Sequence, residues 1–157
     1  MPKTKAQQIM AHRDTRSPEE VTQSILDIAA EFEPYIIRQR RHFHKHPELS
    51  LQEVRTTSDI AGQLDAMNIP YERPLKTGLV ATLRGTAPDA YREDGTPRRR
   101  ILLRADIDAL PVTEQTGEEF ASVNEGCMHA CGHDCHIAMM LGTLQILRHM
   151  TDDIHGE

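Results

Sequence analysis

Polar and apolar residues recur with a helical period in the first part of the chain, where apolar side chains stand three or four positions apart. Ser17 supplies a cap, Pro18 suits the first helical position, and Glu20 completes a capping box. We expect a kink or break just before Pro34, and an end near His46, because the proline that follows disfavours helix in its predecessor. The apolar positions of this helix are Ile25, Ile28, Ala29, Phe32, Ile36 and Phe43.

Two further helices are predicted from the same period. A second capping box, formed by Ser50 and Glu53, precedes a stripe that ends at Asn68 and Pro70. Its positions are Val54, Thr57, Ile60, Ala61, Leu64 and Met67. A third helix is expected to begin near Asp134, and its apolar face is formed by Ile137, Met140, Leu141, Leu144 and Leu147.

Between the second and third helices the pattern changes to short aliphatic runs bounded by glycine and charge, which is typical of strands. These runs are Gly78–Gly85 and Arg100–Ile107, and the polar stretch between them carries an Asp94-Gly95 turn signal. We expect a long antiparallel hairpin. The order of helices and strands predicts an α/β fold in which helices pack on a mixed sheet.

The two ends of the chain carry little pattern. Residues 1–16 have no periodicity and are expected to form a flexible tail. Residues 151–157 are polar, and no further strand follows the third helix although parallel pairing needs such a crossover. The sequence therefore predicts a truncated sheet.

Composition narrows the function classes. The 157 residues are 38% hydrophobic and 27% charged, as in an ordinary globular domain, and the net charge of −6 argues against a nucleic-acid partner. No apolar run is long enough to span a membrane, and no secretory signal opens the chain, so we expect a cytoplasmic protein. The locally basic stretch Arg38–His46 is interpreted as a solvated helix face rather than a phosphate or carboxylate contact.

The densest chemistry lies in residues 129–136, which hold three histidines, two cysteines and one aspartate. Thiolate and imidazole are preferred ligands of Zn²⁺ and similar ions. If the stretch is extended, Cys131 and His133 point to the same side, and Gly132 lets the backbone approach an ion. Asp134 can cap the helix or orient a ligand. The alternative interpretation is a helix start with incidental histidines.

The three cysteines are an odd number within nine residues, which does not fit a disulfide framework. Cys127, Cys131 and Cys135 stand four apart, the spacing of one helix face, and this leaves a structural zinc site or cluster as an alternative. Gly126 and Gly132 make a continuous helix there unfavourable.

A second candidate cluster is the pair Asp106 and Asp108 at the end of a predicted strand. Two residues apart, they share one face, and the carboxyl ends of strands are the usual place for chemistry in open α/β sheets. Alternatively, both carboxylates serve turn amides.

Four stretches, in order and spacing, resemble the N-terminal third of the aminoacylase and carboxypeptidase-like metallopeptidase family. They read HFHKHPELSLQE, TGLVATLRG, RADIDALPVTEQTGEEFAS and MHACGHDCHIAMMLG, and the match covers Tyr35–Met150. The subgroup it is most similar to holds hippurate hydrolase, auxin-conjugate hydrolases and N-acyl amino acid amidohydrolases. The resemblance implies that residues 17–157 form the N-terminal part of a two-metal, exopeptidase-like catalytic domain, without its remaining segments and its lid or dimerisation domain.

The resemblance also implies roles for single residues. Cys131 and His133 correspond to metal ligands, with Cys131 bridging two ions, and Asp108 corresponds to an orienting residue. Three side chains are expected around these ligands without binding metal themselves: Asp106, which stands where relatives outside the subgroup have a histidine ligand, Asp134 and His136. No role is assigned to Cys127 or Cys135.

The chemistry implied is hydrolysis of the amide bond of N-acyl amino acids or short peptides. Two divalent ions, Zn or Mn with Ni or Co as further options, would activate a water, and a glutamate beyond Glu157 would be the general base. The full-length enzyme is compatible with a homodimer. On this interpretation the chain alone is incomplete and inactive. A non-catalytic metal-binding fragment, or a truncated pseudo-enzyme, is the alternative.

Overall fold

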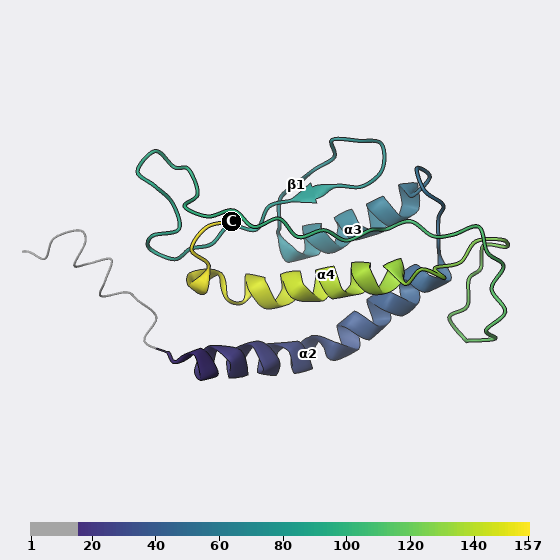
Figure 1. Cartoon of the computed structure of the whole chain (residues 1–157), viewed down its shortest axis with the longest axis horizontal. Coiled ribbons are helices and arrows are strands. Elements are labelled where there is room, and N and C mark those ends of the chain that lie inside the picture. The colour runs from purple at the N-terminus through teal and green to yellow at the C-terminus, as the bar shows by residue number, and fades with distance from the viewer. Residues whose placement is uncertain (1–15) are drawn as a thin grey trace, which may run out of the picture.

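The computed structural model describes residues 16–157. Three α-helices dominate it: α2 (Pro18–Lys45), α3 (Val54–Met67) and α4 (His133–Arg148). In Figure 1, α4 lies between α2 and α3, and it contacts both. Short strands β1 (Tyr71–Glu72) and β2 (Val80–Ala81) and a 3₁₀ turn, η1 (Thr151–Asp153), complete the regular structure of this part of the chain. This arrangement fits a partial α/β catalytic domain.

The core lies where the three helices meet. Its buried side chains come from the end of α2, from α3 and the residues after it, and from α4: Phe43, Ile60, Leu64, Met67, Ile69, Ile137 and Leu141. Half-buried residues of the extended segments, among them Leu79, Leu83 and Ile107, pack against this cluster. The predicted stripes of the second and third helices therefore face the core, except for Val54 at the start of α3, which is exposed. Ile25, on the first turns of α2, is exposed as well.

The start of α2 is the predicted capping box. The Ser17 hydroxyl accepts from the Glu20 amide at 3.2 Å, and the Glu20 carboxylate accepts from the Ser17 amide at 2.6 Å. Of the kink or break predicted at Pro34, the break is wrong, because the helix continues through the proline; the helix does change direction near its middle (Figure 1). Packing against α4 supports the helix just beyond the proline. Ile36 of α2 lies so close to Gly142 of α4 that a Cβ atom on this glycine would be 2.7 Å from the Ile36 side chain.

The predicted Ser50 and Glu53 capping box at the start of α3 is also wrong. Glu53 occupies the N-cap position but makes no side-chain capping bond within the described residues. Glu48 takes this role, because its carboxylate accepts from the amides of Arg55 at 3.2 Å and Thr56 at 2.7 Å. An anion in contact with the unpaired amides of a first helical turn satisfies them and interacts favourably with the helix dipole.

The strands differ most from expectation. Only two residues of Gly78–Gly85 form a strand, β2, and they pair antiparallel with β1, with Tyr71 opposite Ala81. Arg100–Ile107 contains no strand, so the predicted long hairpin is wrong.

The last two residues explain this outcome, because they lie between the two extended segments. The Gly156 carbonyl accepts from the Gly85 amide at 2.8 Å, while Glu157 accepts from the Ile101 amide and donates to the Arg99 carbonyl, both at 3.0 Å. We call residues 99–104 the open segment. Three consecutive apolar side chains on it are exposed: Ile101, Leu102 and Leu103.

The predicted tail, residues 1–16, lies outside the described residues except for Arg16, which forms an ion pair with Asp153. Among residues 16–157, no helix combines the length and apolar character needed to cross a bilayer.

Candidate metal centre

Backbone pairing brings the two candidate clusters together. Leu110 and Met128 exchange amide–carbonyl hydrogen bonds of 2.9 and 3.0 Å in an isolated antiparallel bridge. Ala109 is held from the other side, since its amide donates to the Glu48 carbonyl at 2.8 Å. The chain on one side of this bridge carries the two aspartates, and the chain on the other side leads into the cysteine and histidine stretch. We call residues 106–136 the motif loop.

The predicted ligands Cys131 and His133 converge on Asp108. The His133 Nδ1 atom lies 3.0 Å from both the Asp108 carbonyl oxygen and its Oδ1 atom. The Cys131 sulfur lies 3.7 Å from the same carbonyl oxygen. Cys131 is exposed and His133 is half-buried, so both side chains are open to an ion from solvent.

The route to this convergence differs from the one predicted. The stretch is not extended: Gly132 has φ 87° and ψ 13°, and α4 begins at His133. A side chain at that φ would be strained, which explains a glycine between the two ligands. A sharp turn, rather than strand alternation, therefore brings both Cys131 and His133 against the Asp108 carbonyl.

A donor cluster surrounds His133. Ligand-type atoms of Asp106, His133 and His136 all lie within 4.8 Å of one another, and the two imidazole rings stack with centroids 5.1 Å apart. A hydrogen bond from Arg104, of 2.6 Å at its shortest, lowers the pKa of Asp106 and keeps this carboxylate ionised. Sequence reasoning placed Asp106 and His136 around the ligands, and the structure shows both near enough to His133 to share an ion. The spacing of three between the histidines, one turn of helix, was the available signal.

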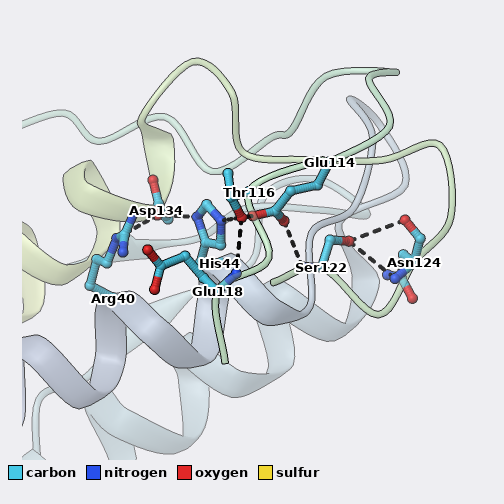
Figure 2. Close-up of polar contacts among 8 residues, drawn as sticks. All are labelled: Arg40, His44, Glu114, Thr116, Glu118, Ser122, Asn124 and Asp134. Atoms are coloured by element: carbon cyan, nitrogen blue, oxygen red, sulfur yellow. Dashed lines mark hydrogen bonds and ion pairs between the residues drawn. The ribbon is translucent and has the colours of Figure 1, made fainter. Parts of the chain in front are cut away.

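Asp134 does not cap α4. It is 1% exposed and accepts from His44 Nδ1 at 2.8 Å and from Arg40 Nε at 2.9 Å (Figure 2). His44 Nε2 in turn lies 3.1 Å from Glu114. Arg40, His44 and Glu114 were not among the predicted site residues. The interpretation of Arg38–His46 as a solvated helix face is wrong for His44, which is buried. The sequence did not reveal this network, because its partners are far apart in the chain.

Glu114 is the most strongly perturbed acid of this network. Burial alone would raise its pKa, but the Ser122 amide, the Thr116 hydroxyl and His44 together lower it to about 2. The Ser122 amide donates to it at 2.6 Å. The carboxylate is therefore ionised although its side chain is only 4% exposed.

The remaining histidine and cysteines of the motif loop show no shared site. His129 is buried, and neither ring nitrogen has a hydrogen-bond partner within residues 16–157; burial lowers its pKa, so the ring is neutral. Burial raises the pKa of the Cys127 thiol. The alternative of three cysteines on one helix face is wrong, because Cys127 and Cys131 precede α4 and only Cys135 lies on it.

Known proteins resemble the chain in both sequence and structure. Residues 102–156 match the family described as Peptidase family M20/M25/M40. The chain is 46% identical over 123 residues to an N-acyl-L-amino acid amidohydrolase of Geobacillus stearothermophilus, which covers 78% of this chain and 31% of that protein. It is 44% identical over 130 residues to an N-acetylcysteine deacetylase of Bacillus subtilis strain 168, covering 80% of this chain and 31% of the relative.

Two solved structures have the same fold over most of the chain. One is the YXEP protein of Bacillus subtilis, described as a dinuclear metal binding peptidase from the M20 family, with a TM-score of 0.71, 42% identity, and coverage of 81% of this chain and 34% of that one. The other is a putative aminohydrolase from methicillin-resistant Staphylococcus aureus, with a TM-score of 0.73, 38% identity, and coverage of 83% and 32%.

These matches confirm the family resemblance that the motifs indicate: the chain is related to the M20 metallopeptidases, and its relatives include N-acyl amino acid amidohydrolases. The chain spans about a third of the length of the curated relatives it matches.

Proposed function

We propose that the chain supplies part of a two-metal centre that hydrolyses the amide bond of small N-acyl amino acids. The observation that carries this proposal is the convergence of Cys131 and His133 on Asp108, with the Asp106 and His136 donors within 4.8 Å of His133. Its support from relatives is the resemblance to an amidohydrolase, a deacetylase and a dinuclear metal-binding peptidase.

The donor set fits a divalent ion. The Asp108 carbonyl can only accept, so the His133 Nδ1 atom donates to it and the lone pair of Nε2 is left for a metal. This carbonyl or carboxylate contact is the usual support of a metal-bound histidine. The Cys131 thiolate is the second ligand and suits Zn²⁺, with Mn²⁺, Ni²⁺ or Co²⁺ as further options. Asp106 and His136 complete the polar surroundings.

When bound, a pair of such ions supplies a Lewis acid and lowers the pKa of a water toward neutrality. The residues of this chain hold and orient that site: Asp108 fixes the His133 ring, and Gly132 sets the angle between the two ligands. Because the relatives are about three times as long, we propose that hydrolysis needs residues beyond these 157, including the general base. A homodimer, a cytoplasmic location and the absence of nucleic-acid or membrane partners stay predictions.

A Co²⁺ titration of the 157-residue chain tests the site directly. A thiolate bound to Co²⁺ gives a near-ultraviolet charge-transfer band, which we expect in the parent chain. Cys131→Ser should abolish the band. Cys135→Ser, in the first turn of α4, is the matched control and should leave the band unchanged. A band that survives Cys131→Ser, or no band in the parent at saturating Co²⁺, contradicts the proposal.

Hydrolytic activity, unlike metal binding, is expected only in a longer protein that contains this chain. The chain alone should leave N-acetyl and N-benzoyl amino acids intact, and a longer protein that contains it should cleave them when loaded with Mn²⁺ or Zn²⁺. An amine-release assay measures both. A metal-loaded longer protein that cleaves none of these substrates contradicts the proposed reaction.

A further inference from the structure

A buried network of charged side chains includes Asp134, the residue that directly follows the predicted ligand His133 (Figure 2). Its centre is His44, on the last turn of α2, with a side chain only 5% exposed. One ring nitrogen contacts Asp134 at 2.8 Å and the other contacts Glu114 at 3.1 Å. Arg40, one turn earlier on α2, reaches the same Asp134 oxygen at 2.9 Å.

Both partners of His44 are carboxylates, and this determines that both ring nitrogens act as hydrogen-bond donors. Ionised carboxylates only accept hydrogen bonds, so His44 satisfies both by carrying N–H on both nitrogens. The network then holds two positive groups, Arg40 and His44, against two negative ones, Asp134 and Glu114. Charges balanced in this way can be buried, whereas an unpaired charge at the same depth is strongly unfavourable.

The network joins three segments that are distant in the sequence. His44 and Asp134 are 90 positions apart, and His44 and Glu114 are 70 apart. Asp134 directly follows His133 at the start of α4, where Gly132 provides no side-chain cap. Contacts from α2 therefore hold the first turn of α4 in place of a cap.

We propose that His44 is a positioning residue for the candidate metal centre: by donating to Asp134 and Glu114 at once, it fixes the first turn of α4 relative to the part of the motif loop that precedes it. His133 and Cys131 consequently meet at Asp108 before any ion arrives. This inference rests on the proposed function for the identity of the site. The positioning itself can be measured without metal.

Amide hydrogen exchange in the metal-free chain tests the positioning. The amides of Gly132, Cys135 and His136 close the turn at the site, donating to the carbonyls of His129 or Gly132 at 3.0 to 3.3 Å. In His44→Gln these three amides should exchange at least about tenfold faster. The Thr57 amide in α3 should change less than about twofold, since local opening leaves the rest of the fold intact.

His42→Gln is the matched control. His42 lies on the same helix and contacts a carboxylate, Asp59, at 2.8 Å, but that pair is partly exposed to solvent and distant in sequence from the motif loop. Exchange of the three turn amides should be unchanged in this variant. Equal acceleration of all amides in His44→Gln, or no acceleration of the turn amides, overturns the proposal.

Co²⁺ affinity supplies the second readout. Loss of a group that supports a metal ligand lowers metal affinity by about 10- to 100-fold, which we expect for His44→Gln and not for His42→Gln. Fast local exchange in His44→Gln, together with no Co²⁺ band in the parent, would support the positioning role and reject the metal site.

If His44→Gln does not fold, Glu114→Gln is the deciding variant. The amides of Gly132, Cys135 and His136 should exchange severalfold faster in it than in the parent chain, and unchanged rates overturn the proposal.

Discussion

The motif loop and the open segment are neighbours in the sequence, yet they are held in very different ways. The motif loop has almost no regular secondary structure, but buried charges from α2 and α4 and a backbone bridge fix it. The open segment carries three consecutive aliphatic residues, but within residues 16–157 its backbone pairs only with Glu157, and Leu102 is 85% exposed. In this molecule, long-range polar contacts hold the candidate site in place. The apolar residues of the open segment, by contrast, are not buried.

The largest effect should come from removing the central acid of the network. Asp134→Ala leaves His44 and Arg40 without their shared partner, and loss of one member of a buried pair costs about 3–5 kcal/mol. Because Arg40 is partly exposed, we expect the lower end, about 3 kcal/mol, in the free energy of urea unfolding. Asp59→Ala, which removes the partner of the partly exposed His42, should cost less than about 1 kcal/mol. Equal costs for the two variants would contradict the contrast between the regions.

Acid should weaken the motif loop in a defined window. The pKa of Glu114 falls from 4.5 in the unfolded chain to about 2 in the folded one, so its contribution to stability is complete above pH 4.5 and is lost as the pH falls toward 2. The urea midpoint should therefore drop between pH 5 and pH 3. Glu114→Gln, which cannot ionise, should show a clearly smaller drop. The same drop in both proteins would show that Glu114 is not perturbed by its surroundings.

The smallest effect is expected on the open segment. Leu102→Lys exchanges an exposed apolar side chain for a charged one, and should change the free energy of unfolding by less than about 0.5 kcal/mol. It should also reduce concentration-dependent self-association in sedimentation velocity, because neighbouring exposed apolar side chains promote association and a charged lysine opposes it. A loss above about 1 kcal/mol would mean that the segment is more tightly packed than its exposure indicates.

The sequence predicts the features that depend on neighbouring residues. The three helices, the Ser17 capping box and the candidate ligands follow from local period and residue type. Capping of α3 by Glu48 was missed, because Ser50 and Glu53 offer an equally plausible local acceptor. The prediction of strands failed for a physical reason. An aliphatic run becomes a strand only when its backbone pairs with another strand, and the backbone at Ile101 pairs with Glu157 instead of the predicted hairpin partner.

The candidate site likewise has one part that the sequence predicts and another part that it does not. The cysteine and histidine stretch is visible in the sequence, because its ligand types are close together. Its support is not visible, since the contact between His44 and Asp134 spans 90 positions and no local period encodes it. The turn at Gly132 was also hidden, because a glycine is compatible with both an extended and a left-handed backbone.

X-ray absorption at the zinc edge of the Zn²⁺-loaded chain tests the central claim most directly. If Cys131 and His133 share an ion at Asp108, the spectrum should contain one sulfur neighbour at about 2.3 Å and nitrogen or oxygen neighbours at about 2.0–2.1 Å. The sulfur contribution should vanish in Cys131→Ser and persist in Cys135→Ser. A first coordination sphere of only nitrogen and oxygen in the parent chain would contradict the account.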